Sequence, residues 1–236
     1  MVNSEAILKV IRSRKSTRTP FDFERKVKKK DLTAIIEAAK WSPTAHNMQN
    51  FEIVVIDDPA LLEKLGDIKS KISEDFLREN YNQLSFSKKE LLRKKVGILG
   101  ANFPASWRDP NRLHEVALHS PPEPLNQTIR GAPVVLLVLF DPRKRAPASP
   151  GDFLGIMSLG CVMENMWLVA ESLHVCFQVM SVFGSDQVGN QLRRILNIPK
   201  ELKIAYAIRL GYGISSSSEY PRVRRDIDML THYNRY

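Results

Sequence analysis

The feature that constrains the fold most is a pair of short apolar segments that lie far apart in the chain. Residues 51–57 (FEIVVID) and 132–141 (APVVLLVLFD) are rich in β-branched and other aliphatic side chains, and each ends in an aspartate. Segments of this length and composition are typical of buried strands. Two further strands are predicted at residues 175–183 (VCFQVMSVF) and 203–213 (KIAYAIRLGYG).

Helical patterns separate these strands. A first helix is predicted from Ser4, its expected N-cap, to about Arg14, and a second after Asp31, which has the side chain of an N-cap. Residues 152–173 are apolar on nearly all sides, which predicts a helix buried at the centre of the core. Strands separated by helices favour an α/β or α+β sandwich in which helices cover a mixed sheet.

The regular alternation is interrupted between about residues 70 and 127. Residues 76–96 are polar and predicted to be helical, whereas residues 102–126 are rich in proline and histidine. Long irregular segments of this kind are usually lids, interface elements or disordered loops. We therefore expect a single domain over residues 1–236, with an insertion at about 70–127 and a C-terminal arm at 214–236.

Composition restricts the function only broadly. Lys and Arg outnumber Asp and Glu by 35 to 26, and the net charge of +9 permits nucleotides, nucleic acids or acidic membranes as partners. Nucleic acid is the weaker expectation, because the cations are not interleaved with exposed aromatic residues. Cys161 and Cys176 lie in apolar stretches, which predicts buried thiols in a reducing compartment. No run reaches the roughly 18 apolar residues of a membrane span and no signal-peptide pattern occurs, so we expect a cytoplasmic protein.

The common catalytic and metal-binding motifs are missing. His114 and His119 are separated by a spacing that points them about 140° apart on a helix, so we expect surface histidines in a loop and no metal. Residues 210–213 (LGYG) lack the glycine spacing of a dinucleotide fingerprint, and no phosphate-binding P-loop occurs. Covalent catalysis is disfavoured, because there is no G-x-S-x-G elbow and Cys161 has no basic neighbour to activate it.

Positive charge is concentrated near both ends of the chain. Residues 12–18 (RSRKSTR) hold four cations among hydroxyl side chains, and residues 221–225 (PRVRR) hold three more. Either cluster alone is typical of a solvated surface. Together they favour an anion site, because a guanidinium group binds two phosphate oxygens at once.

These clusters lie in segments that resemble a known family. Residues 14–18 (RKSTR) resemble the R-x-S-x-[RK] opening of the nitroreductase family of flavin mononucleotide (FMN) enzymes. Residues 42–51 (SPTAHNMQNF) resemble that family's S-P-[ST]-x-x-N-x-Q-P-[WF] loop, with Asn50 in place of the proline. The order of the remaining elements is similar too, and the resemblance extends over residues 4–60 and 128–236.

The resemblance implies a fold, an assembly and a reaction. The fold is a nitroreductase-like α+β three-layer sandwich, in which helices cover a mixed, mainly antiparallel sheet, and two chains entwine as a homodimer. The reaction is a ping-pong transfer of hydride from NAD(P)H through N5 of FMN to an oxidised acceptor such as a nitroaromatic, a quinone or an enone. Alternatives are a deiodinase-like or flavin-destroying member of the same superfamily, or a non-catalytic flavin-binding domain.

The resemblance also implies which residues hold the phosphate and the edge of the flavin ring. The phosphate ligands come from both ends of the chain, and they are Arg14, Ser16, Arg222 and Arg224, with Arg225 as the substitute if the register slips by one. Lys15 contacts the cofactor through its backbone. Arg18 points at the N1/O2 edge of the ring, where negative charge accumulates on reduction, so a fixed cation there raises the two-electron potential.

The remaining ring contacts are expected from both subunits of the implied dimer. The loop of the second subunit supplies Ser42, Pro43 and Thr44 at the dimethylbenzene edge and Asn47 at the pyrimidine side. Asn126 is expected as a further polar contact. The backbone at Ser181 and Val182 faces N5, so no side chain has to act as a catalytic base.

Overall fold

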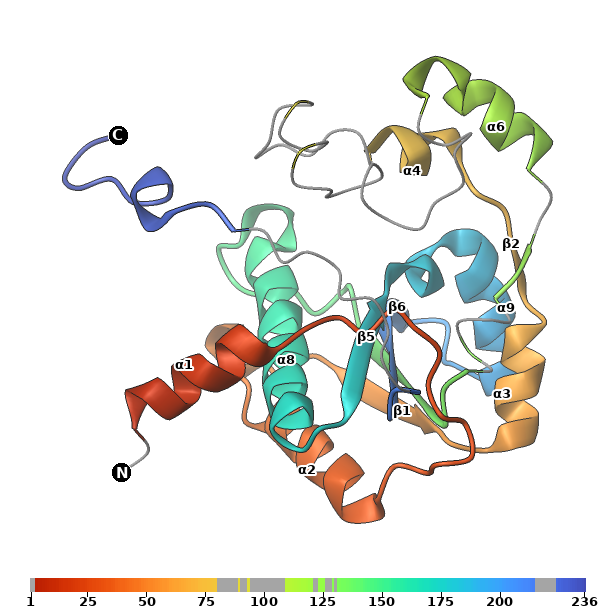
Figure 1. Cartoon of the computed structure of the whole chain (residues 1–236), viewed down its shortest axis with the longest axis horizontal. Helices are drawn as coiled ribbons and strands as arrows, with labels where there is room; N and C mark the ends of the chain where they lie inside the picture. The colour runs from red at the N-terminus through yellow and green to blue at the C-terminus, as the bar shows by residue number, and fades with distance from the viewer. Residues whose placement is uncertain are drawn as a thin grey trace. The chain divides into compact units, whose positions relative to one another are not determined.

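The computed structural model describes most of the chain (Figure 1). The described residues are 3–79, 89, 93, 109–120, 123–125, 129, 131–214 and 224–236. The chain divides into two compact units: residues 1–70 with 124–217 form unit 1, and residues 71–123 with 218–236 form unit 2. The single domain with an insertion and a C-terminal arm stays a prediction.

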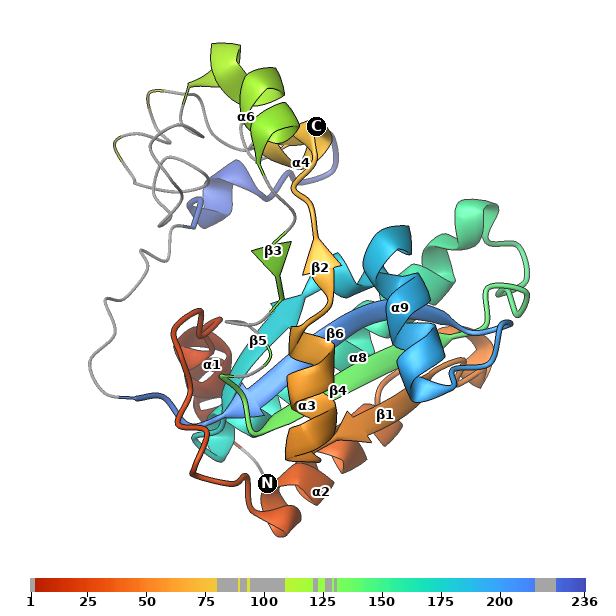
Figure 2. The same ribbon diagram turned by 90° about the vertical axis from the view of Figure 1, so that its right-hand side faces the viewer.

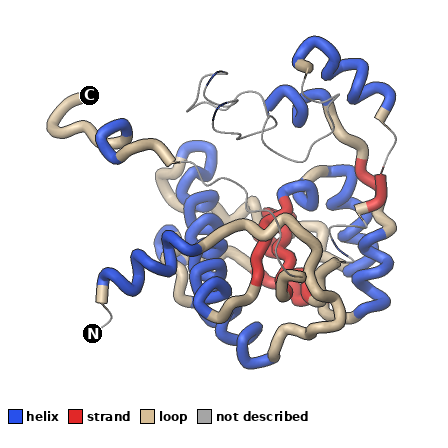
Figure 3. Tube along the Cα trace, viewed as in Figure 1, coloured by secondary structure: helices blue, strands red, loops and turns tan. Residues whose placement is uncertain are grey.

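Unit 1 is built on a four-stranded sheet in the order β1-β4-β6-β5. The strands, drawn in red in Figure 3, are β1 (Glu52–Ile56), β4 (Val134–Phe140), β5 (Cys176–Met180) and β6 (Lys203–Gly211). Each pairs antiparallel with its neighbours. A parallel bridge between Ser16 and Phe177 adds the N-terminal segment to β5, so the pairing is mixed but mainly antiparallel, as predicted.

Helices cover both faces of this sheet (Figure 2). On one face lie α2 (Lys29–Lys40) and α8 (Phe153–Ser172), and on the other lie α3 (Pro59–Gly66) and α9 (Asp186–Leu196). The α+β three-layer sandwich is therefore confirmed, as are the four predicted strands. Unit 1 also contains α1 (Ser4–Ser13), which contacts α8.

The apolar run of β4 explains why a helical layer is needed on each side. Successive side chains of a strand point to opposite faces of the sheet, so a strand that is apolar throughout is stable only where both faces are covered. The β4 side chains that pack under α2 and α8 are Val134, Leu136 and Val138. The β4 side chains that pack under α3 and α9 are Val135, Leu137 and Leu139.

The predicted caps of the first two helices are wrong. Asn3, not Ser4, caps α1, because its Oδ1 accepts a hydrogen bond from the Glu5 N–H at 2.9 Å. α2 begins at Lys29, and Asp31 lies buried inside its first turn. A carboxylate interacts favourably with the helix dipole both at the N-cap and in the first turn. The presence of an aspartate at position 31 therefore did not decide which of these two positions it occupies.

The third predicted strand ends earlier than expected. β5 stops at Met180, and the 3₁₀ helix η6 (Ser181–Gly184) replaces the predicted strand residues up to Phe183. Ser185 fixes this turn, because its Oγ donates to the Val182 carbonyl at 2.8 Å and accepts from the Val188 N–H at the start of α9. Phe183 still points into the core and is fully buried.

α8 is the long apolar helix that the sequence predicted, but only part of its surface is buried. Its inner face includes Met166 and Ala170, whereas Phe153, Ile156 and Met157 are 63%, 61% and 50% exposed. Among the described residues, the stretch Pro150–Ser172 has the length and mean hydropathy, 1.5, of a membrane span. It packs on α2 and β5, as core helices of the same composition also do.

Unit 2 contains α4 (Glu74–Glu79) and α6 (Leu113–His119), with Leu77 and Leu113 buried between them. Both His114 and His119 lie on α6, so the predicted loop is wrong: its proline- and histidine-rich composition concealed an apolar face that packs on α4. Beyond Glu79, the helix predicted over residues 76–96 lies outside the described residues, apart from positions 89 and 93.

The other described elements are short. β2 (Lys69–Ser70) and β3 (Glu123–Pro124) form a two-stranded sheet. The remaining 3₁₀ helices are η1 (Ala45–Asn47), η4 (Pro110–Arg112), η5 (Pro150–Asp152) and η7 (Ile227–Met229).

Candidate functional site

The cationic segment predicted near the N-terminus runs along the edge of β5. α1 ends where the Arg14 N–H donates to the Val10 carbonyl, and the chain then bridges Ser16 to Phe177. The Thr17 N–H donates to the Phe177 carbonyl at 3.0 Å. These backbone bonds place the segment on the sheet, while the side chains of Lys15 and Arg18 stay exposed.

Arg14 is oriented by α8. Its guanidinium carbon lies 4.4 Å from the ring centroid of Trp167, and its Nε lies 3.1 Å from Glu164 Oε1. Trp167 in turn donates from Nε1 to the Lys15 carbonyl at 3.3 Å. A cation stacked on an aromatic face has little rotamer freedom left, so this arginine is preorganised beside the segment.

Arg209 is a residue that the sequence predictions missed. It lies in β6 and is only 2% exposed. Its Nη2 donates to the Thr17 and Thr19 carbonyls at 3.2 and 2.7 Å, and its Nε donates to Gln178 Oε1 at 2.6 Å. Burial lowers the pKa of Arg209 to about 10, which leaves it charged at neutral pH. The sequence did contain a signal for Arg209, which is a lone arginine inside an apolar predicted strand. Such a residue indicates a site with bonded partners, because a buried charge needs them.

The second predicted segment, residues 42–50, is joined to α8. Ser42 is 8% exposed, and its Oγ accepts from Asn165 Nδ2 at 3.0 Å and lies 3.2 Å from the Ala38 carbonyl. The Ala45 N–H donates to Ser158 Oγ at 2.9 Å. Pro43 is exposed between these two attachments, and the Thr44 Oγ1 accepts from the backbone farther along the loop.

The loop backbone between these attachments is strained. His46, Asn47 and Gln49 have φ values of 51°, 53° and 48°. The left-handed region costs a residue with a Cβ roughly 1–2 kcal/mol, although asparagine tolerates it better than most. Strain of this kind persists where surrounding contacts over-determine the backbone, and it clusters at ligand sites. The conformation therefore supports a functional interpretation of this loop.

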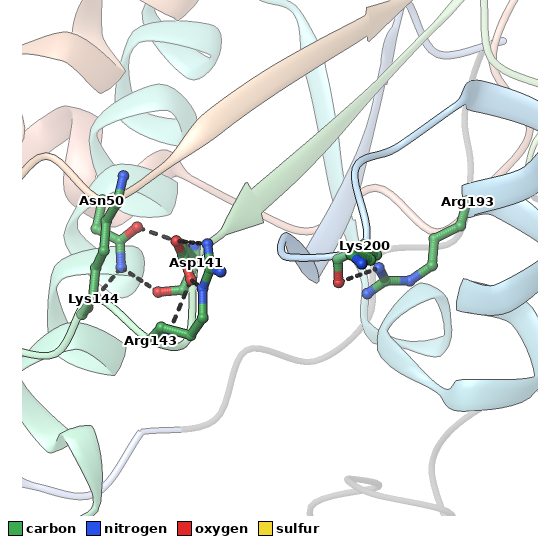
Figure 4. Close-up of polar contacts among 6 residues, drawn as sticks. All are labelled: Asn50, Asp141, Arg143, Lys144, Arg193 and Lys200. Atoms are coloured by element: carbon green, nitrogen blue, oxygen red, sulfur yellow. Dashed lines mark hydrogen bonds and ion pairs between the residues drawn. The ribbon is translucent and has the colours of Figure 1, made fainter.

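Asn50 attaches the end of the loop to the end of β4 (Figure 4). Its Nδ2 donates to the carbonyls of Asp141 and Lys144, both at 2.9 Å, and its Oδ1 accepts from the Asp141 N–H at 3.1 Å. Arg143 holds the Asp141 carboxylate at 2.8 Å and lowers its pKa to about 2 through the side-chain hydrogen bond. The nitroreductase loop that this segment resembles has a rigid proline at this position. This chain instead has an asparagine whose side chain makes three hydrogen bonds.

Asn50→Ala should therefore lower the free energy of unfolding by about 1–2 kcal/mol, because two carbonyls and one N–H lose their partner. The measurement is urea denaturation followed by circular dichroism. Asn50→Asp is the matched variant: it keeps the acceptor but turns an oxygen toward two carbonyls, and it should destabilise at least as much as alanine. We call the three hydrogen bonds of the Asn50 side chain the asparagine clamp. Unchanged stability in both variants would mean that this clamp contributes nothing to the free energy of unfolding.

The backbone of Ser181 and Val182 was predicted to face N5 of the flavin. These residues follow β5, the strand along which the cationic segment runs. Ser181 and Val182 open η6 directly after β5, and Phe177 of that strand carries the bonds to Ser16 and Thr17. Ser181 is exposed and Val182 is half-buried. One edge of the sheet therefore carries both groups of predicted residues.

A hollow lies between the loop, the end of β4 and the start of α8. Its lining is largely apolar and includes Thr44, Met48, Phe51, Phe140, Lys144 and Ile156. Within the described parts of the chain, no three His, Cys, Asp or Glu residues gather as a metal site would require.

Three further residues of the predicted site lie outside the described residues or in unit 2. Asn126 and Arg222 lie outside the described residues. Arg224, like its substitute Arg225, belongs to unit 2. Their part in the site stays a prediction. Unit 1 thus holds Arg14, Lys15, Ser16 and Arg18 along β5, the strand that Ser181 and Val182 follow, and the loop of Ser42, Pro43, Thr44 and Asn47 is attached to α8.

Comparison with known proteins decides the family. The sequence profile of the Nitroreductase family matches residues 11–212, which is most of the chain. The chain belongs to the nitroreductase family. The match begins in α1 and ends just after β6, so it includes the cationic segment, the strained loop and the end of β5.

Individual relatives of this nitroreductase family member are distant. A provisionally named NAD(P)H nitroreductase, YdgI of Bacillus subtilis (strain 168), is 25% identical over 124 residues, which cover 44% of this chain and 59% of that relative. The chain therefore matches less than two thirds of the length of this relative.

Solved structures share the fold over almost the whole chain. A nitroreductase with bound FMN from Bacteroides fragilis NCTC 9343 is 18% identical, with coverage of 95% and 96% of the two chains and a TM-score of 0.57. A second FMN-bound nitroreductase, from Desulfitobacterium hafniense DCB-2, is 19% identical, with coverage of 99% and 100% and a TM-score of 0.60. At these identities the likeness shows a shared fold.

Proposed function

We propose that this protein is an FMN-dependent oxidoreductase that transfers hydride from NAD(P)H to an oxidised acceptor such as a nitroaromatic, a quinone or an enone, in two successive half-reactions. The observation that supports it most is the path of residues 14–18 along β5, with Ser181 at the end of the same strand. The family and two FMN-bound structural neighbours agree with this cofactor.

The residues of this edge fit a phosphorylated ring. Arg14 and the Ser16 hydroxyl would hold the phosphate, with Arg14 already oriented by Trp167. Arg18, exposed on a backbone that is bonded to β5, would lie at the N1/O2 side of the ring. When bound, FMN supplies the hydride-accepting and hydride-donating atom N5. The chain's own part is to position the ring and to stabilise negative charge on it, which needs no side-chain base.

We further infer a homodimer with shared sites. α8 exposes Phe153, Ile156 and Met157, and α1 exposes Ile7 and Leu8. Several large apolar side chains exposed on the surface of a helix are typical of a protein interface. A second copy that covers this surface would bring its own residues 42–47 to the FMN of the first chain. A cytoplasmic location stays a prediction from the sequence.

An absorption spectrum of the purified protein, followed by anaerobic addition of NADPH or NADH, tests the proposal. We expect flavin bands that bleach with the nicotinamide and return when a nitroaromatic or quinone is added. A colourless protein that does not bind added FMN would contradict the proposal. Bands that stay yellow with excess reductant would favour the flavin-binding domain, and bands lost irreversibly in air would favour the flavin-destroying alternative.

A further inference from the structure

Arg209 is a buried cation that the proposed mechanism does not use. Among the described residues, the oxygens that it bonds belong to neutral groups, namely two backbone carbonyls and the side-chain amide of Gln178. The guanidinium carbon also lies 4.2 Å from the ring centroid of Phe21. A charge costs more to bury than an apolar side chain of the same volume, and stability alone rarely accounts for it.

Residues next to Arg209 in the same chain leave room for Phe21 to pack against it. Gly211 lies two residues further along β6, and a Cβ at that position would come within 2.8 Å of Phe21 Cδ2. Phe21 can therefore approach the strand closely only because that residue is a glycine. The Phe21 N–H donates to the Gly131 carbonyl at 3.1 Å, which fixes the far end of the segment that Arg209 holds.

The two carbonyls bonded by Arg209 flank Arg18. The same nitrogen, Nη2, donates to Thr17 on one side and to Thr19 on the other. Because Thr17 also donates to the Phe177 carbonyl, the backbone around Arg18 is held to both β6 and β5. The Arg18 side chain itself is exposed. The Cα from which this side chain starts is therefore held by a backbone that Arg209 restrains on both sides.

Gln178 connects this restraint to the strand end. It faces Arg209 in the β5–β6 register and accepts the Nε hydrogen bond. Ser181 follows three positions later in the chain, directly after the end of β5. One guanidinium group thus joins the Arg18 segment, β6 and the strand that leads to Ser181.

We infer that Arg209 is a positioning residue, which fixes the angle at which Arg18 approaches the reduced flavin and thereby raises the affinity for reduced over oxidised FMN. The inference rests on the proposed function for its effect on FMN. The physical reason is that a fixed cation stabilises developing charge better than one that must reorganise, and displacements of a fraction of an ångström weaken such sites.

Arg209→Lys is the decisive variant, because lysine keeps the charge but cannot donate to two carbonyls and an amide in the fixed fork of a guanidinium. In the protein without FMN, we expect hydrogen exchange of the Thr17 amide to become faster by about tenfold or more. With FMN, the ratio of affinities for reduced and oxidised cofactor should fall by about tenfold, or ~30 mV for a two-electron couple.

Arg25→Lys is the matched control. Arg25 also lies over an aromatic ring, 3.7 Å from the centroid of Tyr212, but its side chain is exposed and is not among the partners of Thr17 or Thr19. This control should change neither the amide exchange nor the potential. If Arg209→Lys does not fold, Gln178→Ala is the second variant, since it removes only the Nε partner, keeps the Arg209 charge and both carbonyl bonds, and should shift both readouts in the same direction.

A double-mutant cycle separates positioning from a general structural effect. Arg18→Ala alone should lower the potential, and Arg209→Lys should lower it no further in that background, because it acts through Arg18. Additive effects, or unchanged Thr17 exchange in Arg209→Lys, would overturn the inference. If the wild type binds no FMN, the proposed function fails, while the exchange measurement still decides whether Arg209 restrains the segment.

Discussion

Replacing Arg14 by alanine should weaken FMN binding by about 2 kcal/mol, which is roughly a 30-fold rise in the dissociation constant. Arg14 is the arginine of the cationic segment that the structure already orients, with Trp167 beneath it and Glu164 beside it. Losing it removes a charge-assisted contact to the phosphate that needs little further ordering. Titration of the FMN-free protein with FMN, followed by flavin fluorescence, measures the effect.

Arg12→Ala is the matched control, because it removes the same charge from the same cluster. Arg12 lies in the last turn of α1 and is not predicted to reach the phosphate. It should reduce FMN affinity only through the long-range field, which salt screens over about 10 Å. Equal losses in both variants would show that net charge, and not a contact from Arg14, retains the cofactor. Full retention by Arg14→Ala would exclude Arg14 as a phosphate ligand.

Replacing Met157 by aspartate should convert the proposed dimer into monomers that do not retain FMN. Met157 is half exposed on α8, next to Phe153 and Ile156. If a second copy covers this surface, the carboxylate would be buried without a partner at a cost of several kcal/mol per subunit. Both sites would then lose the loop that the other subunit supplies. Light scattering after gel filtration gives the mass, and absorbance gives the flavin content.

Leu118→Asp serves as the control for this experiment. Leu118 is 60% exposed on α6 of unit 2, so it is at least as accessible as Met157, and the proposal does not assign it to the α8 interface. It should leave both the mass and the flavin content unchanged. A Met157→Asp protein that remains dimeric and yellow, or a wild type that is monomeric and still binds FMN, would contradict the shared site.

The sheet and its covering helices could be predicted because their signals are local. The run in β4 is apolar at every position, and such a strand is stable only between two layers. Element ends were less accessible. Asn3 and Ser4 are both good N-caps, and Phe183 continues the apolar pattern of β5 although the strand has already ended. Ends depend on small differences between competing hydrogen bonds, which residue types alone do not rank.

In the candidate site, too, the residues could be predicted from the sequence but their partners could not. Residues 14–18 and 42–50 could be singled out from their order of charged, hydroxyl and amide side chains. Their surroundings could not: Arg209 reaches Thr17 and Thr19 from the opposite end of the chain, and Asn50, just before β1, reaches Asp141 and Lys144 just after the neighbouring strand β4. The sequence shows an unusual residue at each place but does not name its partners.

By itself, the sequence determined the alternation of strands and helices, the layers that it requires, and the family whose motifs it carries. These follow from side-chain periodicity and from short patterns that are contiguous in the chain. Only the tertiary structure decided which edge of the sheet carries the cationic segment, that one buried arginine restrains it, and that an asparagine clamp takes the place of a proline. The physical reason is that hydrogen bonds between residues distant in sequence depend on how the layers pack, and packing is settled by the whole core at once.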